Sequence, residues 1–283
     1  MSREMVKKKL VYVWSLRNAA ADQAGQMIDY KGEQRYMKSV LEYLVMQLNN
    51  TDLGDLYTLE AVIFDDDLSL TADANKLKDY GINRQQAKKE SWLYPERLEV
   101  QGRLLDDLLI NVPSTYRQWP IGHAERAAGK DRFEQKLQTQ FDHLQADVVM
   151  LDGLLVILNN LADEANPYFN KIANIHPGIT CAESPFQRRG AMATLDALYG
   201  AKGQRVTNWQ TMATEPAEIK RKTGASFHFI DKGIDSGPVI IDVLNTEITA
   251  EDTILELRWN NFHSSLFPAM REGLSVLAQK ENK

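Results

Sequence analysis

Short apolar runs alternate with segments of helical periodicity along this chain of 283 residues. Strands that repeatedly alternate with helices are typical of βαβ units and a parallel sheet. Strands are expected at residues 10–14, 58–64, 108–112, 147–151, 172–175, 226–230 and 239–244. Helices are expected at residues 32–49, 72–80, 130–145, 191–198 and 251–277, the last with a kink near Pro268. The sequence therefore predicts an α/β fold with a mainly parallel twisted sheet and helices on both faces.

Composition narrows the class of protein. Hydrophobic residues make up 43% of the chain, charged residues 25%, and the net charge is −6. These values are ordinary for a globular protein, whereas nucleic-acid-binding proteins usually carry a basic excess. The longest apolar run, residues 148–158, is interrupted by Asp152 and is too short to cross a bilayer. We therefore expect no nucleic-acid partner and no membrane partner, while the oligomeric state stays open.

The length of the chain bears on its domain organisation, and its cysteine content bears on its cellular compartment. With no long linker or internal repeat, we expect a single domain over residues 1–283, with about residues 245–283 as a C-terminal helical extension packed on it. The only cysteine, Cys181, cannot form an intrachain disulfide and suits a reducing cytosol. Three lysines before the first apolar run imitate a short signal peptide, but that run reads equally well as a buried strand. The prediction is a cytoplasmic protein.

Asn174 and His176 are the polar residues of greatest chemical interest. Two positions apart in a strand, their side chains would face the same side, and Pro177-Gly178 would end that strand. They would lie at a carboxyl end, where open α/β sheets bind ligands. Asp235 stands between two glycines, and a tight turn could bring it to the same place. An amide, an imidazole and a carboxylate together can stabilise an oxyanion and move a proton.

The other acidic and histidine residues suggest simpler roles. Asp65, Asp66 and Asp67 follow a predicted strand and are interpreted as a solvated turn, because adjacent residues of a strand cannot all face one ion. His228 is expected to be a hydrogen-bonded structural residue within a strand. The remaining histidines show no metal-ligand spacing, so we expect no metal.

Three motifs in order resemble the folate-dependent formyltransferases, a family that includes glycinamide ribonucleotide transformylase and methionyl-tRNA formyltransferase. The first is the strand and loop at residues 147–158, and the second is Asn174-Ile175-His176-Pro177. The third combines residues 224–229 with the turn at 234–240. The resemblance covers residues 147–245 well and the first strand weakly. It implies a Rossmann-like formyltransferase fold.

The resemblance also implies site residues and a co-substrate. Asn174, His176 and Asp235 would form the catalytic set, and 10-formyltetrahydrofolate would supply the formyl group. The pterin-like head of the folate would be held by two segments. These are Gly153, Leu154, Leu155, Val156 and Leu158 in the first, and Asp231, Lys232 and Gly233 in the second.

The whole chain further resembles the N5-hydroxyornithine formyltransferases of pyoverdine siderophore synthesis, chiefly through residues 12–22 and 30–40. This resemblance implies formyl transfer to the side-chain nitrogen of N5-hydroxyornithine. Four polar residues follow the first strand in place of the glycine-rich phosphate loop of the purine enzyme: Ser15, Arg17, Asn18 and Asp22. Arg17 would suit the α-carboxylate of the acceptor and Asp22 its α-ammonium.

Other functions fit the same motifs. Water in place of the amine would make the chain a formyltetrahydrofolate deformylase, which is a hydrolase. Another small amine could also serve as the acceptor. A folate-binding protein without catalysis would keep the folate segments but tolerate loss of His176. The sequence assigns no role to residues 65–130.

Overall fold

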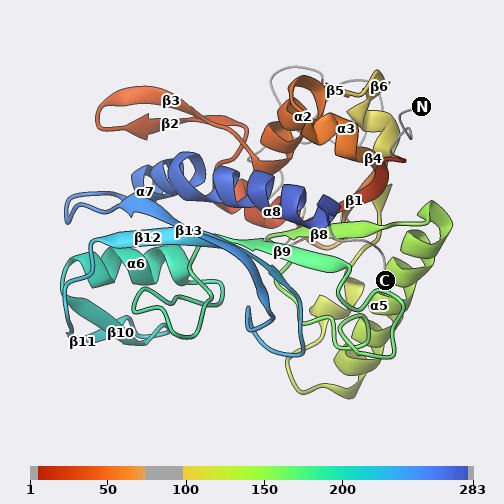
Figure 1. Cartoon of the computed structure of the whole chain (residues 1–283). Helices are drawn as coiled ribbons and strands as arrows, with labels where there is room; N and C mark the ends of the chain where they lie inside the picture. The colour runs from red at the N-terminus through yellow and green to blue at the C-terminus, as the bar shows by residue number, and fades with distance from the viewer. Residues whose placement is uncertain (1–5, 68, 72, 74–97, 280–283) are drawn as a thin grey trace.

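The computed structural model of the chain describes residues 6–279 apart from 68, 72 and 74–97. A seven-stranded sheet runs through the molecule in the order β13-β12-β9-β8-β1-β4-β7 (Figure 1). Its strands in chain order are β1 (Lys8–Trp14), β4 (Tyr57–Phe64), β7 (Leu109–Asn111), β8 (Val148–Asp152), β9 (Ile172–His176), β12 (Lys222–Phe229) and β13 (Val239–Glu247). The first five are parallel, while β12 runs antiparallel to β9 and β13 antiparallel to β12. The predicted mainly parallel sheet is confirmed.

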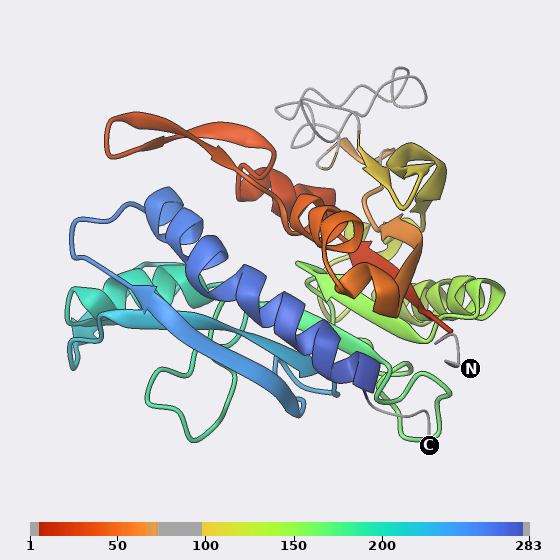
Figure 2. The same ribbon diagram turned by 45° about the horizontal axis from the view of Figure 1, so that its top comes forward.

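Helices cover both faces of this sheet (Figures 1 and 2). On one face α2 (Val40–Asn50), α3 (Leu53–Leu56) and α8 (Phe267–Gln279) pack on Tyr12 and Phe227. On the other face α5 (Ala124–Leu144) packs on Val11 and Val13. Alternate residues of β1 enter the two cores, which explains why this central strand is an uninterrupted apolar run. A further helix, α6 (Ala193–Ala201), contacts β12.

The C-terminal helix is interrupted near Pro268, as predicted. It consists of α7 (Ile254–Asn261), a π-helical turn η3 (Phe262–Leu266) and α8. The wide turn immediately precedes Pro268, which has no backbone N–H and so cannot continue a regular helical hydrogen-bond pattern. Figure 2 shows this C-terminal helical stretch, in blue, running along the sheet.

The helix expected over residues 32–49 is wrong in its first half. A hairpin of β2 (Gln26–Tyr30) and β3 (Glu33–Met37) occupies this region, and α2 begins only at Val40. Lys31 and Gly32 have φ values of 53° and 81°, the geometry of a tight hairpin turn. Ser39 and Glu42 form a capping box that fixes the start of α2.

Several other helices and strands differ from the predicted set. Helix α5 begins earlier than the predicted residue 130, and two further short hairpins were not predicted. These are β5 (Glu99–Val100) with β6 (Arg103–Leu104) and β10 (Gln204–Asn208) with β11 (Ala213–Pro216). Two 3₁₀ turns are η1 (Leu105–Leu108) and η2 (Thr115–Gln118). The expected helix at residues 72–80 lies largely outside the described residues.

The interpretation of residues 65–67 as a solvated turn is wrong. All three aspartates are buried, and Asp66 has no exposed side chain. Asp66 accepts hydrogen bonds from the backbone N–H groups of Leu16 (2.6 Å) and Arg17 (2.9 Å), at the start of α1 (Leu16–Ala21). The guanidinium of Arg17 lies 3.2 Å from Asp65. Buried charges need partners, and here a short helix at the carboxyl edge of β1 supplies them.

Candidate active site

Strand β9 presents Asn174 and His176 at the carboxyl edge of the sheet. Their side chains lie on the same side of the strand, as their spacing predicted. Gly178 follows closely, and a Cβ atom at this glycine would lie 2.5 Å from the carbonyl oxygen of Arg188 and 3.0 Å from Nε2 of His176. That carbonyl oxygen faces Nε2 of His176 at 2.9 Å. Only glycine therefore leaves room for this contact.

Asp235 reaches the same place from the turn between β12 and β13. Its φ of 46° lies in the left-handed region, which aspartate tolerates better than most residues. At Gly237 an added Cβ would overlap the carbonyl oxygen of Phe229, so the returning chain can pass only as glycine. The turn thus aims the carboxylate of Asp235 back towards β9.

The carboxylate of Asp235 is the centre of a four-residue cluster. Oδ2 lies 3.3 Å from Nδ1 of His176 and accepts a hydrogen bond of 2.8 Å from the backbone N–H of Gly190. Oδ1 accepts a hydrogen bond of 3.3 Å from the amide of Asn174 and lies 3.5 Å from Nε2 of His228. We call Asn174, His176, His228 and Asp235 the site cluster. The structure brings the three residues selected from sequence together.

His228 is the member of the cluster that sequence reasoning assigned to a structural role. It lies opposite Asn174 in the antiparallel pairing of β12 with β9, with Nε2 3.3 Å from the Asn174 amide. Its Nδ1 faces the carbonyl oxygen of Phe229 at 2.8 Å and therefore carries the proton. Only the register of β12 against β9 reveals this position, and the register cannot be deduced from spacing within either strand.

Exposure divides the site cluster into two layers. The two imidazoles are almost fully buried, with 5% exposure for His176 and 2% for His228. Asn174 is partly exposed, and the side chain of Asp235 is 16% exposed. The amide and the carboxylate therefore face the edge of the sheet, and the two histidines support them from behind.

Burial and hydrogen bonding act against each other on the pKa values of this cluster. Burial alone would raise the pKa of Asp235, but the His228 hydrogen bond, the charge of His176 and the Gly190 amide together lower it to about 2. Burial lowers the pKa of His176, more than the charge of Asp235 raises it. We conclude that Asp235 is a carboxylate and His176 neutral at neutral pH. Both nitrogens of His176 face acceptors, so a protonated ring could donate one hydrogen bond to the Arg188 carbonyl oxygen and one to Asp235.

The two segments expected to hold the folate head lie side by side. Leu154 and Leu158 are buried in the core beside α5, whereas Leu155 is 64% exposed. The turn at residues 231–233 is shaped by Asp231, which accepts a hydrogen bond from the Gly233 N–H. Lys232 ties this turn to the other segment's loop through an ion pair of 2.6 Å with Asp163. The exposed apolar side chain of Leu155 suits contact with a flat ring, so the residues present fit a folate head.

The four residues after β1 have surroundings of their own within the protein. Arg17 is held by Asp65, Asp66 and Asp73, so its charge is already neutralised within the protein. The amide of Asn18 donates to the carbonyl oxygen of Gly153, and the hydroxyl of Ser15 is buried. Asp22 forms an ion pair of 2.9 Å with Arg258. Arg17 already has three acidic partners, and its contact with a substrate carboxylate stays a prediction.

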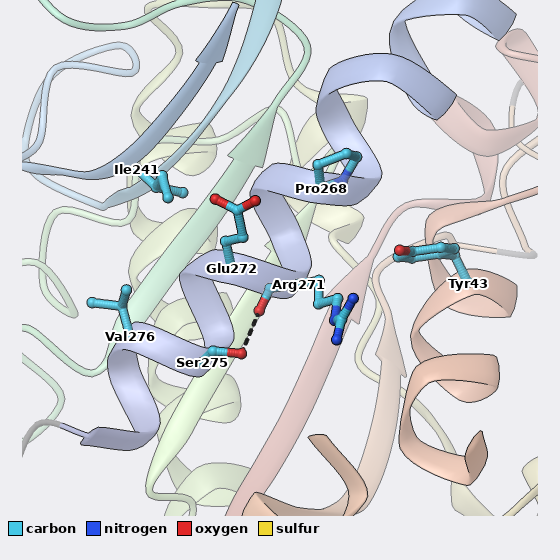
Figure 3. A pocket seen from close by; sticks show the side chains of 7 residues that line it. All are labelled: Tyr43, Ile241, Pro268, Arg271, Glu272, Ser275 and Val276. Atoms are coloured by element: carbon cyan, nitrogen blue, oxygen red, sulfur yellow. Dashed lines mark hydrogen bonds between the residues drawn. The ribbon is translucent and has the colours of Figure 1, made fainter. Parts of the chain in front are cut away.

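A groove of about 440 Å³ opens elsewhere, along α8. Figure 3 shows Ile241 and Val276 on one side of the helix and Tyr43 and Arg271 towards α2. The groove shares no residue with the site cluster and combines an open apolar floor with a few surface charges. It offers no arrangement for acyl or proton transfer.

In the part of the chain that the structure describes, no group of three or more histidine, cysteine, aspartate or glutamate side chains could hold a metal ion. No helix among the described residues has the length and apolar character required to cross a membrane.

Comparison with solved structures defines the class of protein. PvdF of pyoverdin biosynthesis, described as a structurally unique N10-formyltetrahydrofolate-dependent formyltransferase, is 57% identical to this chain. The match covers 97% of this chain and 100% of PvdF, with a TM-score of 0.90. The chain therefore belongs to the N10-formyltetrahydrofolate-dependent formyltransferases. It is an enzyme, and its co-substrate is 10-formyltetrahydrofolate.

More distant structures share the fold alone. Glycinamide ribonucleotide transformylase 1 from Symbiobacterium toebii is 15% identical over 99% of this chain and 93% of its own, with a TM-score of 0.55. A formyltetrahydrofolate deformylase from Pseudomonas syringae pv. tomato is also 15% identical, over 96% of this chain and 63% of its own, with a TM-score of 0.51. No family model matches the chain.

One curated protein matches part of the sequence. Poly(ADP-ribose) polymerase 1 from Arabidopsis thaliana is 28% identical over 160 residues, which span 51% of this chain. The chain covers only 15% of the length of this polymerase. The match is too short and too weak to transfer any activity.

Proposed function

We propose that the enzyme transfers the formyl group of 10-formyltetrahydrofolate to the side-chain nitrogen of N5-hydroxyornithine, within siderophore biosynthesis. The observation that carries the proposal is the 57% identity to PvdF of pyoverdin biosynthesis over almost the whole chain. The acceptor chemistry agrees with the site, because an alkylhydroxylamine is largely uncharged at neutral pH. The carboxylate of Asp235, whose pKa is about 2, is too weak a base to deprotonate an alkylammonium first. The cytoplasmic location stays a prediction.

The folate supplies a formyl carbon that is open to attack by the acceptor nitrogen. As the new C–N bond forms, negative charge develops on the formyl oxygen and the attacking nitrogen becomes acidic. The amide of Asn174 is the partly exposed donor of the cluster and suits that oxygen, since it donates without changing charge. The net result is transfer of one proton from the acceptor nitrogen to the departing folate nitrogen.

We assign the movement of that proton to Asp235 and His176. Asp235 lies at the surface of the cluster and receives the proton from the acceptor nitrogen, and His176 behind it, 3.3 Å away, holds the proton in turn. Nε2 of His176 then donates to the Arg188 carbonyl oxygen while Nδ1 donates to Asp235, so the charged ring is fully hydrogen-bonded. The proton returns by the same path to the folate nitrogen as the bond between that nitrogen and the formyl carbon breaks. His228 touches no reacting atom in this scheme and positions Asp235.

Leu155 and the turn at residues 231–233 would hold the folate head next to this cluster. The ion pair between Lys232 and Asp163 keeps the two segments in register. Leu155 and Ile234 are both exposed and offer apolar contacts to the ring.

The test is turnover of 10-formyltetrahydrofolate with N5-hydroxyornithine, ornithine, glycinamide ribonucleotide or water as acceptor. We expect hydroxyornithine to give the highest kcat/KM, and ornithine to be much poorer because its side-chain amine is protonated. The variants Asn174→Ala, His176→Ala and Asp235→Ala should each lower kcat by about 100-fold or more while circular dichroism stays unchanged. Formate release equal with and without any amine would instead identify a deformylase. Robust formylation of the ribonucleotide would overturn the acceptor assignment.

A further inference from the structure

The loop between β9 and α6 supplies two backbone groups to the site cluster. The carbonyl oxygen of Arg188 faces Nε2 of His176 at 2.9 Å, and the N–H of Gly190 donates to Oδ2 of Asp235 at 2.8 Å. The same Oδ2 lies 3.3 Å from Nδ1 of His176. The end of this loop therefore holds the histidine and the carboxylate from both ends of their shared contact.

Three hydrogen bonds give the loop a fixed shape. Near its start, the hydroxyl oxygen of Ser226 in β12 accepts the Thr180 N–H at 2.8 Å. Near its end, the N–H of Arg188 donates to the carbonyl oxygen of Ile179 at 2.8 Å. The neighbouring Arg189 donates through Nη2 to the carbonyl oxygen of Thr180 at 2.7 Å. The end of the loop is therefore attached to its beginning, which is attached to the sheet.

The side chain of Arg188 attaches the end of the loop to two further elements. This side chain is only 4% exposed, and its Nε donates to Oδ2 of Asp196 in the first turn of α6 at 3.1 Å. Its Nη1 donates to the carbonyl oxygen of Lys222, at the start of β12, at 3.3 Å and to that of Phe186 at 3.4 Å. One buried guanidinium thus joins the loop to a helix and to a strand.

Gly200 of α6 leaves the space that this guanidinium occupies. A Cβ atom added at Gly200 would lie 2.8 Å from Nη2 of Arg188. Glycine within a helix lowers stability relative to alanine, so its presence here fits a packing requirement. Alanine at this position would displace the guanidinium from the helix without removing any of its hydrogen-bonding groups.

Burial makes this an unfavourable position for a charge. Burial lowers the pKa of Arg188, while the charge and the hydrogen bond of Asp196 raise it. Ion pairs removed from water often add little net stability compared with apolar side chains of similar volume. A guanidinium, however, binds several acceptors in fixed directions through a planar set of N–H groups. A role in orientation therefore accounts for Arg188 better than a role in stability.

We propose that Arg188 is a positioning residue for the proton transfer. The contacts of its guanidinium with α6 and β12 fix the end of the loop. The loop in turn holds its carbonyl oxygen against His176 and the Gly190 N–H against Asp235. This inference rests on the proposed function and deepens it, because it names the group that aligns the two residues between which the proton moves.

Gly200→Ala tests the inference because it displaces the guanidinium and leaves every ionisable group in place. With N5-hydroxyornithine as acceptor we expect kcat to fall by about tenfold, in the range of other lost orienting contacts. KM for 10-formyltetrahydrofolate should stay within about twofold, since the segments expected to hold the folate lie outside this loop. The melting temperature should change little, because the helical preference of alanine offsets the displacement.

The ring nitrogens of His176 give a second measurement, by NMR, that needs no turnover. The pKa of this ring is set by burial first and then by groups on every side of it: the charges of Asp235, His228 and Arg189 and the Arg188 carbonyl oxygen. The contact with that carbonyl oxygen raises the pKa. Gly200→Ala should therefore shift the Nε2 resonance and lower the pH at which the ring takes up a proton.

Gly129→Ala in α5 is the matched control, since its added carbon would lie 2.6 Å from Cβ of Tyr116. This control should lower the melting temperature but leave kcat and the His176 resonances unchanged. Arg188→Lys, which keeps the charge but loses the planar set of donors, should lower kcat at least as much as Gly200→Ala. If Arg188→Lys does not fold, as circular dichroism reports, Gly200→Ala decides alone.

A wild-type kcat or unchanged His176 resonances in Gly200→Ala would overturn the inference, as would a similar change of both in the control. A lower melting temperature with kcat unchanged would give Arg188 a structural role only. If the wild-type enzyme does not formylate N5-hydroxyornithine, the acceptor assignment fails instead. The His176 resonances then still decide whether Arg188 positions the histidine.

Discussion

His228 and Asn174 stand opposite each other across β12 and β9, with the imidazole Nε2 3.3 Å from the amide nitrogen. Nδ1 of His228 faces the carbonyl oxygen of Phe229, which holds the ring in place, and Nε2 faces both the Asn174 amide and Oδ1 of Asp235. The ring lies against the Asn174 amide and so fixes the orientation of the amide. The same amide group donates to Asp235. One buried histidine thus orders both residues that face the edge of the sheet.

Replacing His228 tests this ordering role. In His228→Gln we expect kcat to fall by about 10- to 100-fold, in the range of other lost orienting contacts. The pKa of Asp235 should rise, because His228 supplies the foremost of the interactions that lower it. Activity that needs ionised Asp235 is lost as pH falls through that pKa, so the acidic limb of the kcat profile should move to higher pH. An unchanged limb would show that His228 has no influence on Asp235.

Gly178→Ala tests the contact between His176 and Arg188. The added carbon would lie 2.5 Å from the carbonyl oxygen of Arg188, so the loop must move and the His176 hydrogen bond must lengthen. We expect kcat to fall by about tenfold and the free energy of unfolding by about 1–3 kcal/mol. Gly32→Ala is the control, since it strains a distant hairpin turn with nothing within 4 Å. Equal loss of activity in both variants would contradict the specific role of Gly178.

Asp66 should make stability depend on pH. Burial and the neighbouring charge of Asp65 raise its pKa to about 6, while Arg17 and two backbone N–H groups lower it. The folded pKa is above the unfolded value, so the stabilising contribution is full below about pH 4 and is lost as pH rises through about 6. Unfolding by urea should therefore show a decline in stability between pH 4 and 7 that is absent in Asp66→Asn. The same decline in both proteins would assign it to another group.

The ion pair between Lys232 and Asp163 should affect the folate more than the fold. Both side chains are well exposed, so Lys232→Ala should leave the melting temperature nearly unchanged. We expect KM for 10-formyltetrahydrofolate to rise by about three- to tenfold as the two segments lose their connection. Lys222→Ala breaks an exposed ion pair with Glu247 between β12 and β13 and is the matched control. A similar KM in both variants would mean that the connection does not support folate binding.

The sequence predicted the sheet and most of the site cluster for identifiable reasons. Largely apolar runs mark β1, β4 and β8, because strands buried on both faces are rich in apolar residues. The Asn174 and His176 spacing gave their shared face without any knowledge of neighbours. Residues 65–67 were misinterpreted because their partner, Arg17, lies on another element and only the folded chain unites them. His228 was underestimated for the same reason, since its role depends on strand register.

At residues 32–49 a helical spacing of apolar residues competes with turn and capping signals, which explains why the helix was predicted to begin too early. Tyr36 and Val40 have helical spacing with the residues that follow, yet Tyr36 lies in a hairpin strand. The Lys31-Gly32 turn and the Ser39-Glu42 capping box are both visible in the sequence and mark the true boundary. The hairpin itself gains from Trp259, whose ring lies 5.0 Å from that of Tyr30, a contact no local pattern reveals.

The antiparallel attachment of β12 to β9 also sets the order in which the enzyme can become active during its synthesis. Strands β1, β4, β8 and β9 leave the ribosome first, so a nascent chain can assemble the parallel sheet together with Asn174 and His176. The carboxylate of Asp235 follows only after β12, and its turn closes only when β13 pairs with β12. A chain stalled before Val239 would therefore carry the folate segment and a finished sheet edge but no ordered acid–base pair. Nascent enzyme of this kind could sequester folate without consuming the formyl group.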